Sequence, residues 1–284
     1  QDGVFEMVSK GFHWRESGDV RVLVPDFFDA LNLRGGYSTR TSASGRNLDC
    51  DFRGGKDRPE ILRNRRLIAA AMEIDPSTLV VAEQIHGDRV ATVAAKDAGC
   101  GAASHESAVA ATDALVTADD FLSLAGLAAD CAILLLADQG HRAIASVHNG
   151  RRGAVLDIAA ATVAAIGPLG PSPGDLFVSI GPSICLSCYE VGPQVASEFE
   201  QAFPWAHEFL KISSGRAHLD LSGVIRRQLV EAGVRDDRVF DAGLCTVCRN
   251  DLFYSYRKER ESAGRFVGVV SLAPTAALTS EDRK

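Results

Sequence analysis

The distribution of apolar residues predicts buried strands in the middle of the chain. Near-continuous apolar runs occupy Leu122–Ala129, Ala132–Ala137, Ala143–Val147 and Leu176–Ile180, and the shorter run Asp113–Thr117 precedes them. Apolar runs of this length without alternation are typical of strands covered on both faces. We therefore expect a sheet in the interior, with other elements packed against it.

Helical spacing occurs on both sides of these runs. Pro59–Met72 repeats apolar residues at helical intervals behind a proline suited to a first turn. Ala154–Ile166, Val195–Phe203 and Ser222–Ala232 are further predicted helices, the last with Ser222 as its N-cap. The mixture predicts an α+β fold in which mixed sheets are flanked by helices.

The pattern contains no convincing linker and no repeat, which favours a single domain over residues 1–284. Residues 1–20 are expected to form a peripheral N-terminal segment that contributes an edge segment to the fold. Leu79–Ile85 is predicted to be a strand that delivers His86 to a turn. Asn32–Asn47 is rich in Gly, Ser, Thr and Arg and is predicted to be a loop, whose glycines would let backbone amides approach a ligand.

Three potential metal ligands stand at the ends of strand-like runs: His86, Cys131 and His148. Two imidazoles and a thiolate suit zinc and leave a fourth position for water or substrate. Zinc there would make hydroxide available near neutral pH. Two other interpretations remain open: a Cys131–His148 nucleophile pair, or a buried cysteine and two unrelated histidines.

The remaining cysteines include two Cys-x-x-Cys pairs, Cys185/Cys188 and Cys245/Cys248. The pairs are much further apart than the roughly 15–20 residues of a zinc ribbon. We expect four buried thiols, and a structural four-cysteine zinc site is the alternative.

Composition narrows the classes of function. The net charge of −7 argues against a nucleic-acid surface, and no apolar run reaches the roughly 18 residues of a membrane span. Seven cysteines and no export signal suggest reduced thiols in the cytoplasm. Arginines in turn segments are compatible with a small anionic substrate.

Motifs spread in order from about Gly35 to Gly268 resemble the laccase-domain family, also called the multicopper polyphenol oxidase or YfiH family. The matching elements include Gly35-Gly36-Tyr37-Ser38, Gln84-Ile85-His86-Gly87, Asp113–Thr117, Ala129-Asp130-Cys131, Tyr189–Gly192 and Phe253–Arg257. The resemblance implies a YfiH-like fold, grouped with the cysteine hydrolases, and zinc on His86, Cys131 and His148, which would also be the catalytic residues.

The resemblance further implies a purine nucleoside phosphorylase and adenosine deaminase. Its reactions would be phosphorolysis of adenosine, inosine or methylthioadenosine and hydrolytic deamination of adenosine. We expect Arg46, Asn47, Arg152 and Arg257 to contact phosphate or ribose. A monomer is expected.

The alternatives are a copper-dependent polyphenol oxidase, a Cys–His thiol hydrolase and a non-enzymatic binding protein. Seven histidines are too few for a multicopper cluster, although a His₂Cys site can also bind copper.

One segment departs from the family pattern beside a predicted ligand. The family usually has His-Ala-Gly-Trp-Arg-Gly where this chain has His148-Asn149-Gly150-Arg151-Arg152-Gly153. The histidine is kept and an aromatic residue is lost, so the departure bears on substrate preference more than on metal binding.

Overall fold

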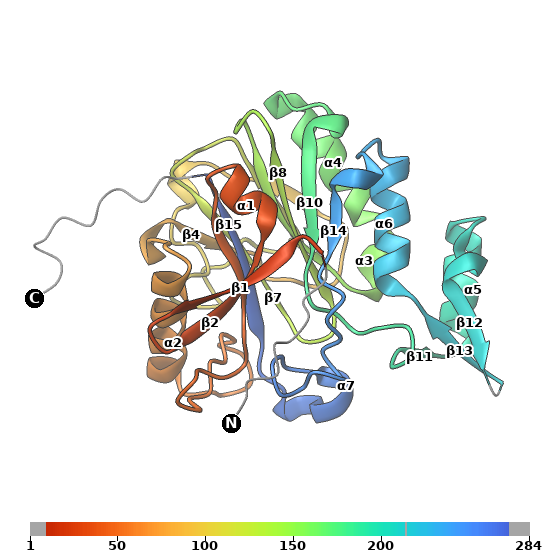
Figure 1. The fold of residues 1–284 in the computed structure, drawn as a ribbon, viewed down its shortest axis with the longest axis horizontal. Helices are drawn as coiled ribbons and strands as arrows, with labels where there is room; N and C mark the ends of the chain where they lie inside the picture. Colours follow the sequence, from red (N-terminus) through yellow and green to blue (C-terminus); the bar gives the residue numbers. More distant parts are fainter. Residues whose placement is uncertain (1–9, 214, 273–284) are drawn as a thin grey trace, which may run out of the picture.

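The buried strands divide between two six-stranded mixed sheets that pack face to face (Figure 1). The computed structural model describes residues 10–213 and 215–272. The first sheet has the order β1-β2-β3-β15-β7-β4. Its strands are β1 (Phe12–Ser17), β2 (Val20–Pro25), β3 (Arg34–Ser38), β4 (Leu79–Val81), β7 (Ser123–Ala128) and β15 (Phe266–Ser271).

The second sheet has the order β14-β10-β8-β9-β6-β5. Its strands are β5 (Val90–Thr92), β6 (Ala114–Thr117), β8 (Ala132–Asp138), β9 (Ile144–Asn149), β10 (Leu176–Ile180) and β14 (Val239–Asp241). A small third sheet has the order β11-β13-β12. It comprises β11 (Glu190–Val191), β12 (Leu210–Ser213) and β13 (Arg216–Leu219).

Both faces of the second sheet are apolar because each faces a different core. In β8, Ile133 and Leu135 belong to the core between the sheets, whereas Leu134 and Leu136 belong to the core beneath the helices. Alternate side chains of a strand point to opposite faces, so a continuous apolar run fills both cores at once.

Helices cover the outer faces of the two sheets (Figure 1). Helix α2 lies against the first sheet, α3, α4 and α6 lie against the second, and α5 stands beside the small third sheet. The helices are α1 (Asp26–Ala30), α2 (Arg58–Ala71), α3 (Arg151–Val155), α4 (Ile158–Ile166), α5 (Pro193–Ala202), α6 (Leu221–Glu231) and α7 (Tyr256–Glu259).

Strand β15, from the C-terminal end of the chain, lies inside the first sheet. It pairs antiparallel with β3 on one side and β7 on the other, so that Gly268 is opposite both Tyr37 and Gly126. The first sheet therefore combines strands from the beginning, the middle and the end of the sequence.

The predicted α+β class, with mixed sheets and flanking helices, is confirmed. Among the described residues, no helix is long and apolar enough to cross a membrane. The single-domain boundaries 1–284 stay a prediction, because residues 1–9, 214 and 273–284 lie outside the described residues. The peripheral segment 1–20 also stays a prediction; of its described residues, those of β1 form an edge of the first sheet.

Four local predictions were wrong. The predicted loop Asn32–Asn47 contains strand β3, whose two glycines adopt positive φ where neighbouring strands approach closely. A Cβ on Gly35 would lie 2.0 Å from the Val269 carbonyl oxygen, so these glycines serve strand packing. The strand predicted over Leu79–Ile85 ends at Val81.

The predicted helix Ala154–Ile166 is two helices, α3 and α4, separated at Asp157. Asp157 has a left-handed backbone (φ 57°) and caps α4 by accepting a hydrogen bond from the Ala160 amide. The N-cap of α6 is Asp220, not Ser222, because its carboxylate accepts from the Gly223 amide.

Candidate metal centre and active site

The three predicted ligands meet where the chain crosses between the two sheets. His86 lies in the loop from β4 of the first sheet to β5 of the second, and Cys131 lies in the turn from β7 of the first to β8 of the second. His148 lies near the end of β9 opposite Ile133, so both side chains face the space between the sheets. Sheet crossings thus bring together residues that are far apart in sequence.

The donor atoms of His86, Cys131 and His148 lie within 4.8 Å of one another, and the two imidazole rings are 4.7 Å apart between centroids. Gly150 leaves room for this cluster. A Cβ at that position would lie 2.6 Å from Cys131 Sγ and 3.3 Å from His86 Cδ2. The backbone of Gly150 is not unusual, so the requirement is space rather than conformational freedom.

Asp113 organises two of the three ligands, a role that the sequence analysis missed. Its carboxylate accepts hydrogen bonds from His148 Nδ1 at 2.8 Å and from the amides of His86 at 2.9 Å and Gly87 at 2.8 Å. Because Nδ1 of His148 is occupied, Nε2 is the nitrogen left for a metal. The available signal was a single carboxylate at the start of an apolar strand, Asp113 before β6.

Three non-glycine residues near the cluster have a left-handed backbone: Gln84 (φ 59°), His86 (φ 62°) and Asp130 (φ 86°). Such conformations persist only where surrounding contacts hold them. The Gln84 side chain supplies some of these contacts, since its amide bonds both the N–H and the carbonyl of Leu127. Backbone strain is therefore concentrated at the sheet crossings that carry His86 and Cys131.

The residues of the cluster also shift one another's pKa values. Burial opposes ionisation of Cys131, but the His148 and His86 imidazoles outweigh it and lower the pKa of this thiol to about 6. Burial likewise disfavours the charged His148, but Cys131 and Asp113 outweigh it and raise the pKa of His148 to about 9. Without a metal, the favoured state at neutral pH is a thiolate–imidazolium pair, and thiolate is the form of cysteine that binds metals.

A cavity of about 570 Å³ opens over the cluster, and all three donor residues line it. Its other walls are partly apolar, with Leu127, Ile184 and Tyr189 among them, and partly cationic. The cationic lining comprises Arg53, Arg151, Arg152, Arg257, Arg260 and Arg265. A small ligand with a flat apolar part and an anionic part matches this division.

The four expected substrate contacts divide into two pairs. Arg152 and Arg257 line the cavity. Arg46 and Asn47 are not among the residues that line it. Asn47 Oδ1 instead accepts from the Tyr254 hydroxyl at 2.6 Å and from the Asp49 amide at 2.8 Å, so it holds a surface turn together.

The two arginines that line the cavity differ in how they are held. Arg257 donates to the Glu190 carbonyl oxygen at 2.9 Å and stacks over Tyr189. Arg152 makes no ion pair or side-chain hydrogen bond within residues 10–213 and 215–272, so its guanidinium is available to a ligand.

Asp130 lines the cavity but is fully engaged by protein groups. One carboxylate oxygen accepts from the Thr246 hydroxyl and the other from the Arg257 amide, both at 2.6 Å. Asp130 therefore joins the Cys131 turn to the segments that contain Thr246 and Arg257. Its role is structural rather than that of a free general base.

Comparison with known proteins agrees with this architecture. Residues 31–273 match the family model described as multi-copper polyphenol oxidoreductase laccase. The chain belongs to this family. The resemblance found in the sequence motifs is thereby confirmed.

Relatives in this family carry the names of purine nucleoside enzymes. A purine nucleoside phosphorylase of Streptomyces coelicolor is 36% identical, over 77% of this chain and 85% of the relative. A protein named adenosine deaminase, from an unknown prokaryotic organism, is 32% identical over 83% of this chain and 90% of its own. The crystal structure of YlmD from Geobacillus stearothermophilus superposes with a TM-score of 0.85 at 26% identity, covering 92% and 99% of the two chains.

The two positions that depart from the family pattern, Asn149 and Arg151, both have distinct structural environments. Asn149 is fully buried, and neither of its side-chain polar atoms has a partner among the described residues. Arg151 lines the cavity and pairs with Glu198 of α5 at 2.6 Å. An ion pair therefore occupies the part of the cavity wall where an aromatic residue is usual.

Proposed function

We propose that this family member is a zinc-dependent purine nucleoside enzyme. Its reactions would be phosphorolysis of adenosine, inosine or methylthioadenosine and hydrolytic deamination of adenosine. The observation that carries the proposal is the convergence of His86, Cys131 and His148 at a cavity with apolar and arginine-lined walls. The names of the relatives point to the same substrate class.

The donor set fits zinc, since two imidazoles and one thiolate are ligands that zinc prefers and the cavity leaves a further position accessible. The space at Gly150 and the lowered pKa of Cys131 support the same assignment. A bound zinc ion would supply Lewis acidity, which acidifies water and polarises substrate atoms.

The residues of the chain would position the substrate around this centre. The apolar wall formed by Leu127, Ile184 and Tyr189 suits the faces of a purine ring. Arg152 and Arg257 suit a phosphate, because a guanidinium binds phosphate oxygens through paired hydrogen bonds. Asp113 would fix the tautomer and orientation of His148.

Product analysis with adenosine, with and without phosphate, tests the proposal. Adenine and ribose 1-phosphate signal phosphorolysis, and inosine signals deamination. Zinc-loaded protein is expected to form at least one of these product sets, and metal-free protein to regain the activity when zinc is restored. Cys131→Ser should abolish both zinc binding at this site and turnover.

Cys100→Ser is the matched control, because Cys100 is a half-buried cysteine outside the cluster. Adenosine turnover that is equal in zinc-free and zinc-loaded protein would overturn the zinc mechanism. No turnover of any purine nucleoside by the zinc-loaded chain would overturn the substrate class.

A thiol hydrolase is the second candidate, and the Cys131–His148 pair with Asp113 behind it favours it. In metal-free protein, the rate of Cys131 alkylation should rise with pH through a midpoint of about 6. Hydrolytic activity that persists without metal and is lost on alkylation would support this candidate over the zinc enzyme.

Copper-dependent phenol oxidation is less well supported by the site. Within residues 10–213 and 215–272, only two groups of three or more potential ligands converge, and only one of them contains histidine. A multicopper centre needs more histidines than this group provides.

A further inference from the structure

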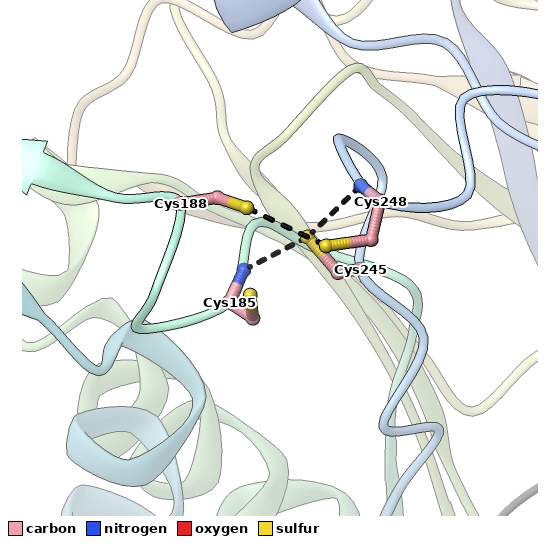
Figure 2. Close-up of side chains that lie close together, drawn as sticks. All are labelled: Cys185, Cys188, Cys245 and Cys248. Atoms are coloured by element: carbon pink, nitrogen blue, oxygen red, sulfur yellow. Dashed lines mark hydrogen bonds between the residues drawn. The ribbon is translucent and has the colours of Figure 1, made fainter.

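The second group of potential ligands consists of the four cysteines of the two Cys-x-x-Cys pairs (Figure 2). Each pair lies on a tight turn: the Cys188 amide donates to the Cys185 carbonyl, and the Arg249 amide to the Cys245 carbonyl. A parallel bridge between Ser183 and Cys245 holds the two turns side by side. The fold thus joins two pairs whose separation in sequence argued against a common site.

The positions of the sulfurs fit one metal ion. All four lie within 4.8 Å of one another, and the Cys188 and Cys248 sulfurs are 3.5 Å apart. Four sulfurs at about 2.3 Å from a central zinc form a tetrahedron with edges of about 3.8 Å. Only small side-chain movements separate the observed arrangement from that tetrahedron.

Two backbone amides are directed at one of these sulfurs. The amides of Cys185 and Cys248 lie 3.4 Å and 3.5 Å from Cys245 Sγ (Figure 2). Amide hydrogen bonds stabilise a thiolate and orient it, as outer-shell donors do for metal ligands generally. Half-burial of Cys185 and Cys188 and the exposure of Cys248 also contradict the expectation of four buried thiols.

We propose that Cys185, Cys188, Cys245 and Cys248 bind a zinc ion at a structural site. This site is separate from the cluster of His86, Cys131 and His148, which is called the active-site cluster on the basis of the proposed function. Four thiolates fill the tetrahedral coordination of zinc and leave no position for substrate. None of the four cysteines lines the cavity. The ion would therefore stabilise the fold rather than take part in catalysis.

The location of this four-cysteine site suggests which part of the protein a bound zinc ion would stabilise. Ile184 and Tyr189 flank the first pair and line the cavity, and Thr246 beside Cys245 bonds Asp130. A zinc ion here would clamp two chain segments that form one wall of the active site. Backbone pairing joins these segments through the short parallel ladder of β10 and β14 and, beyond it, the bridge between Ser183 and Cys245.

Metal stoichiometry in reduced protein tests the site independently of the proposed activity. Cys131→Ser, purified anaerobically with reductant and equilibrated with zinc, is expected to retain one zinc ion per chain after gel filtration. Cys188→Ser and Cys248→Ser in the same background should retain none. Cys100→Ser in that background is the matched control and should retain one.

Cobalt gives a second measurement that does not depend on how well the Cys188→Ser and Cys248→Ser variants fold. Cobalt(II) bound to Cys131→Ser should show the intense thiolate charge-transfer bands of a tetrahedral tetrathiolate complex, and zinc should displace it.

Two outcomes would overturn the proposal. One is no zinc and no cobalt bands in the Cys131→Ser protein. The other is a Cys188–Cys248 disulfide, detected by mass spectrometry in protein kept reduced throughout. Failure of the active-site proposal would leave these measurements unchanged, since they are made without the Cys131 ligand.

Discussion

The two cysteine-containing clusters have similar donor atoms but differ in the role that their geometry supports. The active-site cluster has three donors, two of them imidazoles, and opens into a cavity of about 570 Å³. The four-cysteine site has four sulfurs and lies outside that cavity. Number of donors and access to a ligand, rather than the presence of cysteine, distinguish a reactive centre from a clamp.

The active-site cluster is also supported differently. Hydrogen bonds from the Asp113 carboxylate and the Gln84 side chain hold its loops, which contain the left-handed residues Gln84, His86 and Asp130. The four-cysteine site has two tight turns and two amide–sulfur hydrogen bonds. We infer that the first cluster exists before metal binds, whereas the second depends on metal for much of its rigidity. Five variants test this contrast and the proposals for the cavity around the first cluster.

The largest expected effect distinguishes the two clusters directly. Cys131→Ser should reduce nucleoside turnover by more than about a hundredfold, because even loss of an outer-shell partner typically costs 10–100-fold. Cys248→Ser should affect turnover less but lower the melting temperature more. A loss of about 2 kcal/mol lowers it by about 4–8 °C in a chain of this size. Measurements of turnover and of thermal unfolding for both variants check this prediction. Equal losses of turnover and equal decreases in melting temperature in the two variants would contradict the proposed difference between the clusters.

Asp113→Asn should have the next largest effect. An amide cannot accept hydrogen bonds from His148, His86 and Gly87 as a carboxylate does, so ligand orientation suffers. We expect a loss of about 10–100-fold in zinc affinity or kcat. Zinc titration and steady-state kinetics measure it. Unchanged affinity and kcat would show that the imidazole is oriented by packing alone.

Arg152→Ala should affect phosphorolysis selectively. Loss of a charged hydrogen bond of about 1.5–3 kcal/mol should raise the KM for phosphate by roughly 10–100-fold, while deamination continues. The exposed Arg63 of α2 provides the control, since Arg63→Ala removes the same charge far from the cavity lining. Equal losses in both reactions would indicate that Arg152 supports the fold rather than phosphate.

The smallest expected effect concerns Asn149. Its side-chain amide is buried without a partner among the described residues, which costs stability. Asn149→Ala, the residue usual in the family, should therefore raise the free energy of unfolding by about 1 kcal/mol. Asn64→Ala is the control and should destabilise, because it removes a buried hydrogen bond to the Asp49 carbonyl. Destabilisation by Asn149→Ala would reveal a bound partner for this amide.

The sequence predicted the positions of the strands more successfully than their pairing within the sheets. Apolar runs identified β7, β8, β9 and β10 closely, because burial on both faces requires such runs. They could not show that β7 and β8, adjacent in sequence, belong to different sheets. That crossing depends on the three-residue turn around Asp130, whose backbone conformation is fixed by distant partners such as Thr246.

The candidate ligands of the site could be predicted from their residue types, but the residues that position these ligands could not. His86, Cys131 and His148 are chemically conspicuous, and each follows or ends an apolar run. Asp113 is as central to the geometry, yet a carboxylate before a strand has many ordinary meanings. Arg46 and Asn47 fit the chemistry of phosphate binding, but only tertiary packing decides which polar loop faces a cavity.

The position of β15 bears on how the protein is made. A strand that pairs with both β3 and β7 cannot join the first sheet until residues 266–271 have left the ribosome. Until then two strand edges stay open and are available for wrong pairing. Such long-range pairing slows folding. Nascent chains that stop before Phe266 would thus be expected to lack a closed first sheet and to aggregate readily.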